Sequence, residues 1–452
     1  MSGSEPTSDL FGPCGRRPGS RLVLALAVVL WTACSSAPAP VVAPLREAAV
    51  RRPVVLVPGI TGSMLRDRNS GRVVWGAGAR LLAPRDGGYE VALPLGTGED
   101  RLEATEVLER IRLAGLSKDV YGPIVRMLEA NGYRRGDFQN PSRDASLFLF
   151  AYDWRRDNEE TVALLARDLE ALRRARGVDR LEVDLLCQSN GGHVCRYFAK
   201  YGGLSLDDAE AGRPRDSRID VRKLILVGTS NGGSLRILRM LDRGRKYVFF
   251  GRKIQPETMF TFRALFQDLP AYSERIFLDK EGRVLDVDLY DPESWETYGW
   301  SVFGAETRRR LDRREREDLF GSADDRREYL SRVLEQARRL QDLLLRDADL
   351  GGARYYLVQN AYAETPSRGV LERRDGSWKT WLTGDRELAR LPYVKSLATA
   401  PGDGHATVES QMWLAPREKE ALARPPFYVR GDHFELILER STLQALAEML
   451  AE

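Results

Sequence analysis

Short apolar runs alternate with helical patterns along the first half of the chain. The apolar runs cover 53–57, 147–150, 183–186 and 223–227. The run 53–57 is continuous, which is typical of a strand that is covered on both faces, and the other three are also predicted to be buried strands. Between the runs, apolar residues recur at helical spacing over 120–130 and 162–172, and Gly177 is a stop signal for the second helix. This order predicts an α/β fold with a mainly parallel, doubly wound sheet.

The second half carries further local signals. Ser322 precedes a long charged helix over 323–345, and Asp375-Gly376 is typical of a hairpin turn. The stretch 235–352 is rich in aromatic residues, and its place in the chain predicts an inserted cap. Its aromatic residues fit either a small core of the cap or an acyl-chain pocket. The stretch 69–116 shows no clear period, so we expect an irregular flap there.

Composition narrows the class of partner. Apolar residues make up 43% of the chain and charged residues 30%, and the net charge is only +3. So small a net charge argues against a nucleic acid as the partner. The length of 452 residues favours one main domain with large insertions. The four cysteines show neither a disulfide framework nor zinc spacing, and the sequence predicts no metal and no cofactor.

The N-terminus has the pattern of an export signal. Arg16, Arg17 and Arg21 precede an apolar run over 22–31 that is too short to span a membrane. We expect a signal peptide over 1–33, lipidation of Cys34 and a flexible tether over 34–50. The protein would then be a lipoprotein of the bacterial cell envelope. Plain secretion, with cleavage at a nearby small residue, is the alternative.

A tight polar turn around Ser189 follows the apolar run 183–186 and leads into a helical pattern. A serine at a sharp break from strand to helix is typical of a nucleophile elbow. Gly191 and Gly192 meet the need for small residues, but Cys187 stands where G-x-S-x-G has its first glycine. The turn at Ser230 fits G-x-S-x-G better. However, strand order favours Ser189, because Ser230 comes one strand late for an α/β-hydrolase.

Several motifs together give the chain a resemblance to the lecithin:cholesterol acyltransferase family. They are VPGITGSML from Val57, GYRRGDF from Gly132, AYDWR from Ala151, the Ser189 turn, ILVGTSNGGS from Ile225, PGDGHATVES from Pro401 and GDHFELIL from Gly431. The resemblance implies an α/β-hydrolase fold with a lid and a membrane-facing cap. The expected division is a hydrolase core over 51–234 and 353–452, interrupted by the cap over 235–352.

A serine nucleophile requires a histidine base and an acid that orients it. The chain has only three histidines. The family resemblance points to His433 as the base and to Asp403 as the acid. His405 lies beside the acid and stays an alternative base, as does His193, which lies one helical turn after Ser189. Asp432 adjoins His433, but adjacent side chains diverge, so Asp403 is preferred.

These residues predict an ester-cleaving or acyl-transferring enzyme. Backbone N–H groups of Ile60, by resemblance, and of Asn190, by elbow geometry, would receive the oxyanion. The acyl group would pass from Ser189 to water or to an alcohol. The expected substrate is a lipid ester such as a phospholipid, met at a membrane surface. Two alternatives stay open: a non-lipid serine esterase or peptidase of the same fold, and a catalytically inactive envelope protein.

Overall fold

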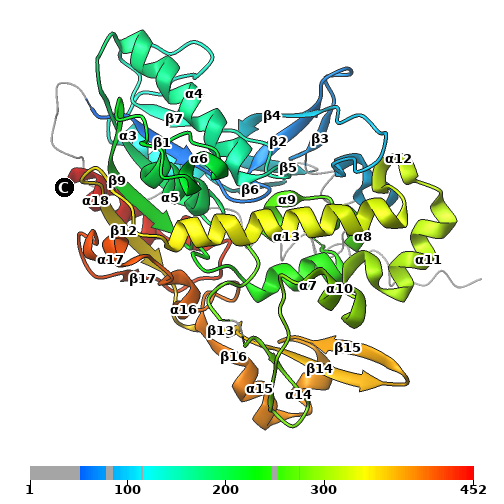
Figure 1. Cartoon of the computed structure of the whole chain (residues 1–452). Coiled ribbons are helices and arrows are strands. Elements are labelled where there is room, and N and C mark those ends of the chain that lie inside the picture. The colour runs from blue at the N-terminus through cyan, green and yellow to red at the C-terminus, as the bar shows by residue number, and fades with distance from the viewer. Residues whose placement is uncertain (1–50, 78–84, 114–115, 247–251, 274) are drawn as a thin grey trace, which may run out of the picture.

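The computed structural model describes residues 51–77, 85–113, 116–246, 252–273 and 275–452 (Figure 1). The predicted signal peptide, Cys34 and the tether lie outside the described residues, and so does the apolar run 248–250. Among helices in the described ranges, none is both long and apolar enough to cross a membrane.

A six-stranded sheet forms the centre of the molecule. Its order is β17-β12-β9-β8-β1-β7, and every pair of neighbours is parallel. The strands are β1 (Val54–Val57), β7 (Leu147–Leu149), β8 (Leu181–Gln188), β9 (Ile219–Val227), β12 (Arg354–Gln359) and β17 (Phe427–Tyr428). The predicted parallel sheet is therefore confirmed. The chain leaves β1 toward β7 and leaves β8 toward β9, so the carboxyl ends of β1 and β8 flank a topological switch point.

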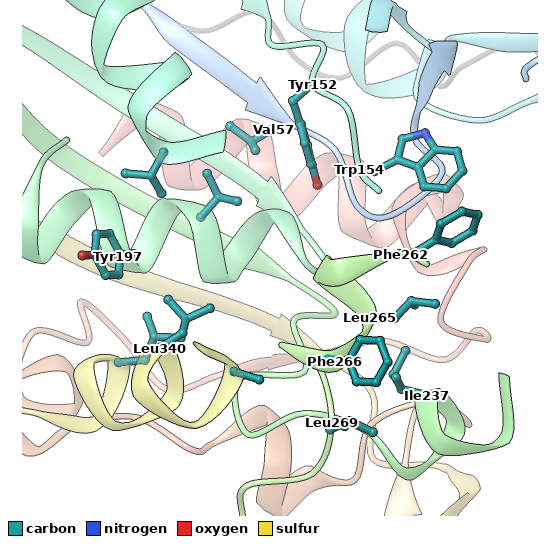
Figure 2. Close-up of a cluster of buried hydrophobic side chains, with 14 of the residues drawn as sticks. Val57, Tyr152, Trp154, Tyr197, Ile237, Phe262, Leu265, Phe266, Leu269 and Leu340 are labelled. Carbon is teal, nitrogen blue, oxygen red and sulfur yellow. The ribbon is translucent and has the colours of Figure 1, made fainter. Parts of the chain in front are cut away.

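Both faces of this sheet are covered by helices. Val54 and Leu56 point into a cluster with α3 (Gly122–Ala130) and α18 (Arg440–Ala451). Val55 and Val57 point the other way, into the larger cluster that includes α4 (Asn158–Arg176) and α5 (Gly191–Tyr201). Figure 2 shows part of that cluster, with Tyr197 of α5 near Leu340 of α13 (Ala323–Leu345). A strand buried on both faces needs no polar positions, which explains the continuous apolar runs.

Local signals in the sequence place the helix ends well. α4 ends at Gly177, which adopts the left-handed conformation at φ 66°. α13 begins at a capping box in which Ser322 accepts from the Asp325 amide and Asp325 accepts from the Ser322 amide. α13 then runs across the molecule, in contact with α5 of the core and with α9 and α10 of the inserted stretch (Figure 1).

The expectation of an irregular stretch over 69–116 is wrong. It contributes strands to two small antiparallel sheets, β3-β2-β4 and β5-β6. The stretch contains β3 (Val73–Trp75), β4 (Leu102–Val107) and β5 (Arg110–Leu113), with the 3₁₀ helix η1 (Arg85–Val91) between β3 and β4. Their partners β2 (Ser63–Asp67) and β6 (Leu116–Asp119) lie before the stretch and at its end. Such short strands do not repeat a pattern for long enough to give a recognisable period.

The stretch 235–352 folds mostly into helices. They are α7 (Leu235–Arg243), α8 (Pro256–Phe260), α9 (Arg263–Phe266), α10 (Pro292–Tyr298), η2 (Ser301–Phe303), α11 (Ala305–Arg314), α12 (Glu317–Phe320) and α13. Trp295 and Trp300 are fully buried and contact each other edge to face. Trp300 also stacks on Phe277 and Tyr298. These aromatic residues are packed in the same hydrophobic cluster as Val55 and Val57 of the central sheet, so the stretch shares the core of the molecule.

The predicted hairpin at Asp375-Gly376 is confirmed. Both residues have positive φ, as a two-residue hairpin turn requires, and they join β14 (Gly369–Arg374) to β15 (Ser377–Trp381). This hairpin extends the sheet of β10 (Phe277–Leu278) and β11 (Val284–Leu285). The remaining elements are α6 (Leu206–Glu210), β13 (Ala363–Pro366), α14 (Arg386–Ala389), α15 (Pro392–Ala398), β16 (Thr399–Gly402), α16 (Val408–Gln411), α17 (Pro416–Glu420) and η3 (Leu436–Leu438).

Candidate active site

Ser189 lies at the break between β8 and α5, at the carboxyl edge of the central sheet. Its φ is +52°, a backbone conformation that a serine adopts only where the surroundings impose it. A Cβ on Gly191 would approach the carbonyl oxygen of Val57 to 2.5 Å, and one on Gly192 would approach Thr229 to 2.2 Å. The glycines therefore let strand and helix come close enough to form a strained turn.

Ser189, His433 and Asp403 form a continuous hydrogen-bonded chain. His433 Nε2 lies 3.0 Å from Ser189 Oγ, and His433 Nδ1 lies 2.7 Å from Asp403 Oδ2. The three residues follow β8, β16 and β17, so segments far apart in sequence meet at one edge of the sheet. All three side chains are buried. The spacing matches a nucleophile, a base and the acid that orients the base.

The Asp403 carboxylate is held in its charged form. Its Oδ1 accepts the backbone N–H groups of His405 at 2.8 Å and Ala406 at 2.7 Å. Burial alone would raise the pKa of Asp403, but the attraction of His433 and these hydrogen bonds hold that pKa below its usual value. A charged Asp403 favours the His433 tautomer with its proton on Nδ1, which leaves Nε2 free to accept from the Ser189 hydroxyl.

The predicted oxyanion donors flank Ser189. Ile60 lies in the loop after β1 and lines the same pocket as Ser189, and Asn190 begins the turn into α5. Within the described part of the chain, neither backbone N–H has a hydrogen-bond partner. The loop after β1 is held in place by Tyr121, whose hydroxyl accepts from the Gly59 amide and donates to Gln188. Both amides are therefore free to bind an oxygen of a substrate.

The other candidate residues do not contact Ser189. The ring of His405 stacks on that of His433 with a centroid distance of 4.3 Å. His193 is buried, and its Nε2 lies 2.8 Å from the backbone oxygen of Ser230. Ser230 donates its hydroxyl to Asp268 at 2.6 Å. Asp432 accepts from the amides of the two residues after His433.

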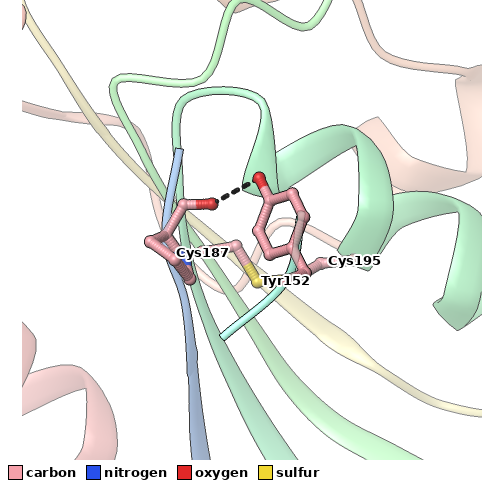
Figure 3. Close-up of a disulfide and its surroundings, with 4 residues drawn as sticks. Tyr152, Cys187 and Cys195 are labelled. Carbon is pink, nitrogen blue, oxygen red and sulfur yellow. Dashed lines mark hydrogen bonds between the residues drawn. A yellow bond between two sulfur atoms is a disulfide. The ribbon is translucent and has the colours of Figure 1, made fainter. Parts of the chain in front are cut away.

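A disulfide joins Cys187 to Cys195 (Figure 3). Cys187 thus pairs with a residue of α5 at the position where the sequence pattern favours glycine. The expectation that the cysteines form no disulfide framework is therefore corrected by this bond. The two cysteines are eight positions apart in the sequence, and the reversal of the chain at the elbow brings their Cα atoms to 6.6 Å. Beside the bond, Tyr152 donates its hydroxyl to the backbone oxygen of Pro58.

The space in front of Ser189 is small. Its volume is about 20 Å³, enough for one water molecule. The walls include the apolar side chains of Ile237, Met240 and Leu265, and two of these belong to α7. Asp268 also lines this space, and no sequence signal had pointed to it. Within the described ranges, no group of three or more His, Cys, Asp or Glu residues is placed to hold a metal ion.

Comparisons with known proteins identify the class of protein that this chain resembles. Residues 87–266 match the model of the lecithin:cholesterol acyltransferase family, which confirms the resemblance. The matched region includes Ser189 but not Asp403 or His433. The match supports an acyltransferase-like or lipase-like enzyme. No curated protein matches the chain.

Two solved structures are similar to the chain. In the crystal structure of the Tle4–Tli4 complex, a chain with 16% identity covers 89% of this chain and 98% of its own length, with a TM-score of 0.55. The mature lipase BlEst2 of Bacillus licheniformis has 12% identity, covers 90% of this chain and 95% of its own length, and has a TM-score of 0.34. The similarity to the first of these structures, together with the parallel central sheet, confirms the predicted α/β-hydrolase fold.

Proposed function

We propose that the protein is a serine-dependent lipase or O-acyltransferase that forms an acyl-enzyme on Ser189. The observation that carries this proposal is the chain of two hydrogen bonds from Ser189 through His433 to Asp403. The family match supports the same class of reaction. The substrate class, a lipid ester such as a phospholipid, rests on the family resemblance.

The reaction would proceed in two halves. His433 takes the proton of the Ser189 hydroxyl as Oγ bonds to the ester carbonyl carbon. The carbonyl oxygen becomes an oxyanion and accepts from the amides of Ile60 and Asn190. The intermediate then collapses, and the departing alcohol receives the proton from His433. In the second half, His433 deprotonates water or an acceptor alcohol, which takes the acyl group and releases Ser189.

A fluorophosphonate probe tests the nucleophile directly. We expect it to attach to Ser189, as located by mass spectrometry of the labelled peptide. Ser189→Ala should lose the label and lower ester turnover on the order of 10³-fold or more. Ser230→Ala is the informative comparison, because it should still carry the label on Ser189. If Ser230→Ala lost the label and Ser189→Ala kept both the label and full activity, Ser230 would be the nucleophile instead of Ser189.

Substrate preference needs a separate measurement. Purified protein would be given a short soluble ester and a long-chain phospholipid in mixed micelles, with and without an added alcohol acceptor. Faster turnover of the phospholipid is the expected result, and formation of a new ester would identify acyl transfer. Turnover of the soluble ester alone would favour a non-lipid esterase, and no turnover or probe labelling would favour an inactive envelope protein.

We also propose that the protein works outside the cytoplasm, at a membrane surface. The Cys187–Cys195 disulfide supports an oxidising compartment. The sequence pattern before Cys34 supports a lipid anchor there. Palmitate labelling of the expressed protein tests the anchor, and a Cys34→Ser variant should lose the label. Equal labelling of both proteins would contradict the assignment of Cys34.

A further inference from the structure

Two side chains that the reaction above does not use face one buried carboxyl group, that of Asp268. Asp268 follows α9 and is 1% exposed. Ser230 donates its hydroxyl to Asp268 Oδ1 at 2.6 Å, and His405 Nε2 lies 3.8 Å from Asp268 Oδ2. His193 contacts the same turn through the backbone oxygen of Ser230. Among the described residues no arginine or lysine forms an ion pair with Asp268, and a buried acid beside a nucleophile is a candidate for a functional role.

The path from this carboxyl group leads to the proposed base. The ring of His405 lies between Asp268 and His433, with its Nε2 toward Asp268 and its face stacked on His433 at 26°. Asp268 also lines the pocket in front of Ser189. His433 therefore has the Asp403 carboxylate at hydrogen-bond distance. The Asp268 carboxylate is farther away, on the other side of the His405 ring.

The charge states of these groups agree with such a role. Burial raises the pKa of Asp268 to about 6, so its carboxyl group is charged at neutral pH. Burial, and then repulsion by His433, hold the pKa of His405 well below its usual value, so this imidazole is neutral. The titratable groups that face Asp268 are His193, His405, His433, Asp403, Tyr152 and Tyr290.

We propose that Asp268 is a positioning residue whose carboxylate, acting through the stacked ring of His405, stabilises the protonated form of His433. His433 gains a positive charge when it takes the Ser189 proton, and a second nearby negative charge lowers the energy of that state. His405 links the two groups in position: its neutral ring packs on one face of His433, and its Nε2 faces the Asp268 carboxylate. This proposal rests on the proposed function only in assigning His433 as the base.

Histidine NMR tests the proposal without relying on activity. The chain has only three histidines, so a ¹³C-histidine-labelled sample gives three sets of ring signals, and His433→Ala identifies the set that belongs to His433. Asp268→Asn keeps the shape and the acceptor for Ser230 but removes the charge. We expect it to lower the pKa of His433 by roughly one unit. The acid limb of kcat/KM for a neutral soluble ester should move to lower pH with it.

Control variants separate this role from a loss of packing. Asp184→Asn removes another buried carboxylate, in the middle of β8 where it pairs with Arg52, and should leave the pKa of His433 unchanged. An unchanged pKa of His433 in Asp268→Asn would overturn the proposal, even if activity fell. If Asp268→Asn does not fold, Ser230→Ala is the second test. It removes the hydrogen bond that favours the charged form of Asp268, so it should shift the pKa of His433 in the same direction, by less.

A double-mutant cycle tests the part played by His405. His405→Phe keeps a ring against His433 but removes the nitrogen that faces Asp268. The shift caused by Asp268→Asn should be smaller in the His405→Phe background than in the parent. An equal shift in both backgrounds would overturn transmission through His405. Failure of Ser189 to label with a fluorophosphonate would instead disprove the proposed function, and the NMR result would stand independently.

Discussion

Cys187 and Cys195 are joined by a disulfide across the turn that carries Ser189. Cys187 lies on the last part of β8 and Cys195 lies on α5, so the bond links the strand that ends at the proposed nucleophile to the helix that follows it. The α/β-hydrolase elbow usually has a glycine at the position of Cys187. Here a buried sulfur occupies that position and restrains the turn covalently.

Removing this bond should destabilise the fold more than it impairs the reaction. The loop that it closes is short, so a Cys187→Ser/Cys195→Ser variant should lose about 2 kcal/mol in free energy of unfolding. Urea denaturation measures the loss, and reductant should produce a similar change in the parent but none in the variant. Hydrogen bonds around Ser189 do not involve either sulfur, so ester turnover of the folded variant should remain. Unfolding of the parent that is insensitive to reductant would contradict the expected stabilisation.

The three histidines should differ sharply in their effect on turnover. His433→Ala should lower kcat on the order of 10³-fold or more, because it removes the only imidazole within hydrogen-bond distance of Ser189 in the described part of the chain. Asp403→Asn should cost a similar factor, because it favours the wrong tautomer of His433. His193→Ala should have the smallest effect on kcat. Steady-state kinetics on a soluble ester provide the measurement, and a His405→Ala variant less active than His433→Ala would identify His405 as the base.

Gly191 should tolerate no side chain. A Cβ there would lie 2.5 Å from the Val57 oxygen and 2.7 Å from the Pro58 oxygen, both in the backbone of the loop that carries Ile60. Gly191→Ala should therefore lower the free energy of unfolding by about 1–3 kcal/mol and reduce ester turnover. Gly71→Ala is the control. A Cβ on Gly71 would contact no other atom, so this substitution costs only the strain of a positive φ, about 1 kcal/mol. Equal turnover in the two variants would show that the elbow can adjust.

Asp268 should make the stability of the protein depend on pH. Its pKa is raised from 3.8 to about 6, so the folded state binds this proton more tightly than the unfolded chain does. The resulting stabilisation is fully present below pH 3.8 and is lost as pH rises through about 6. Asp268→Asn cannot ionise at this position, so its free energy of unfolding should not fall as pH rises. Relative to the parent, the variant should therefore gain up to about 3 kcal/mol as pH rises from 3.8 to above 6.

Thermal or urea unfolding at pH 4 and pH 8 checks the sign of this effect. The variant should be relatively more stable at pH 8 than at pH 4, while its turnover at pH 8, where Asp268 of the parent is charged, should be lower than that of the parent. A gain in stability with a loss of activity is typical of a residue kept for function. A variant that loses stability equally at the two pH values would show that burial does not raise the pKa of Asp268.

Local chemistry explains which features could be predicted from the sequence. The apolar run before Ser189, the glycines after it and the stop at Gly177 act within a few residues, so the pattern alone indicated a strand, a turn and a helix. The scarcity of histidine reduced the candidate bases to three. Strand order then separated Ser189 from Ser230, although Ser230 fits the motif better. The pairing of Ser189 with His433 and Asp403 in the structure agrees with that choice, and their catalytic roles stay a proposal.

Features that depend on contacts between distant segments required the tertiary structure. Nothing in the sequence around Asp268 marks it, because its importance comes from Ser230, His405 and the pocket that other elements bring to it. The short strands over 69–116 lacked a period and were recognised only through their partners. The Cys187–Cys195 bond likewise depends on how far the chain reverses at the elbow. Sequence thus determined the local elements and the candidate groups, whereas packing decided which groups meet, because proximity across 244 residues is a property of the whole fold.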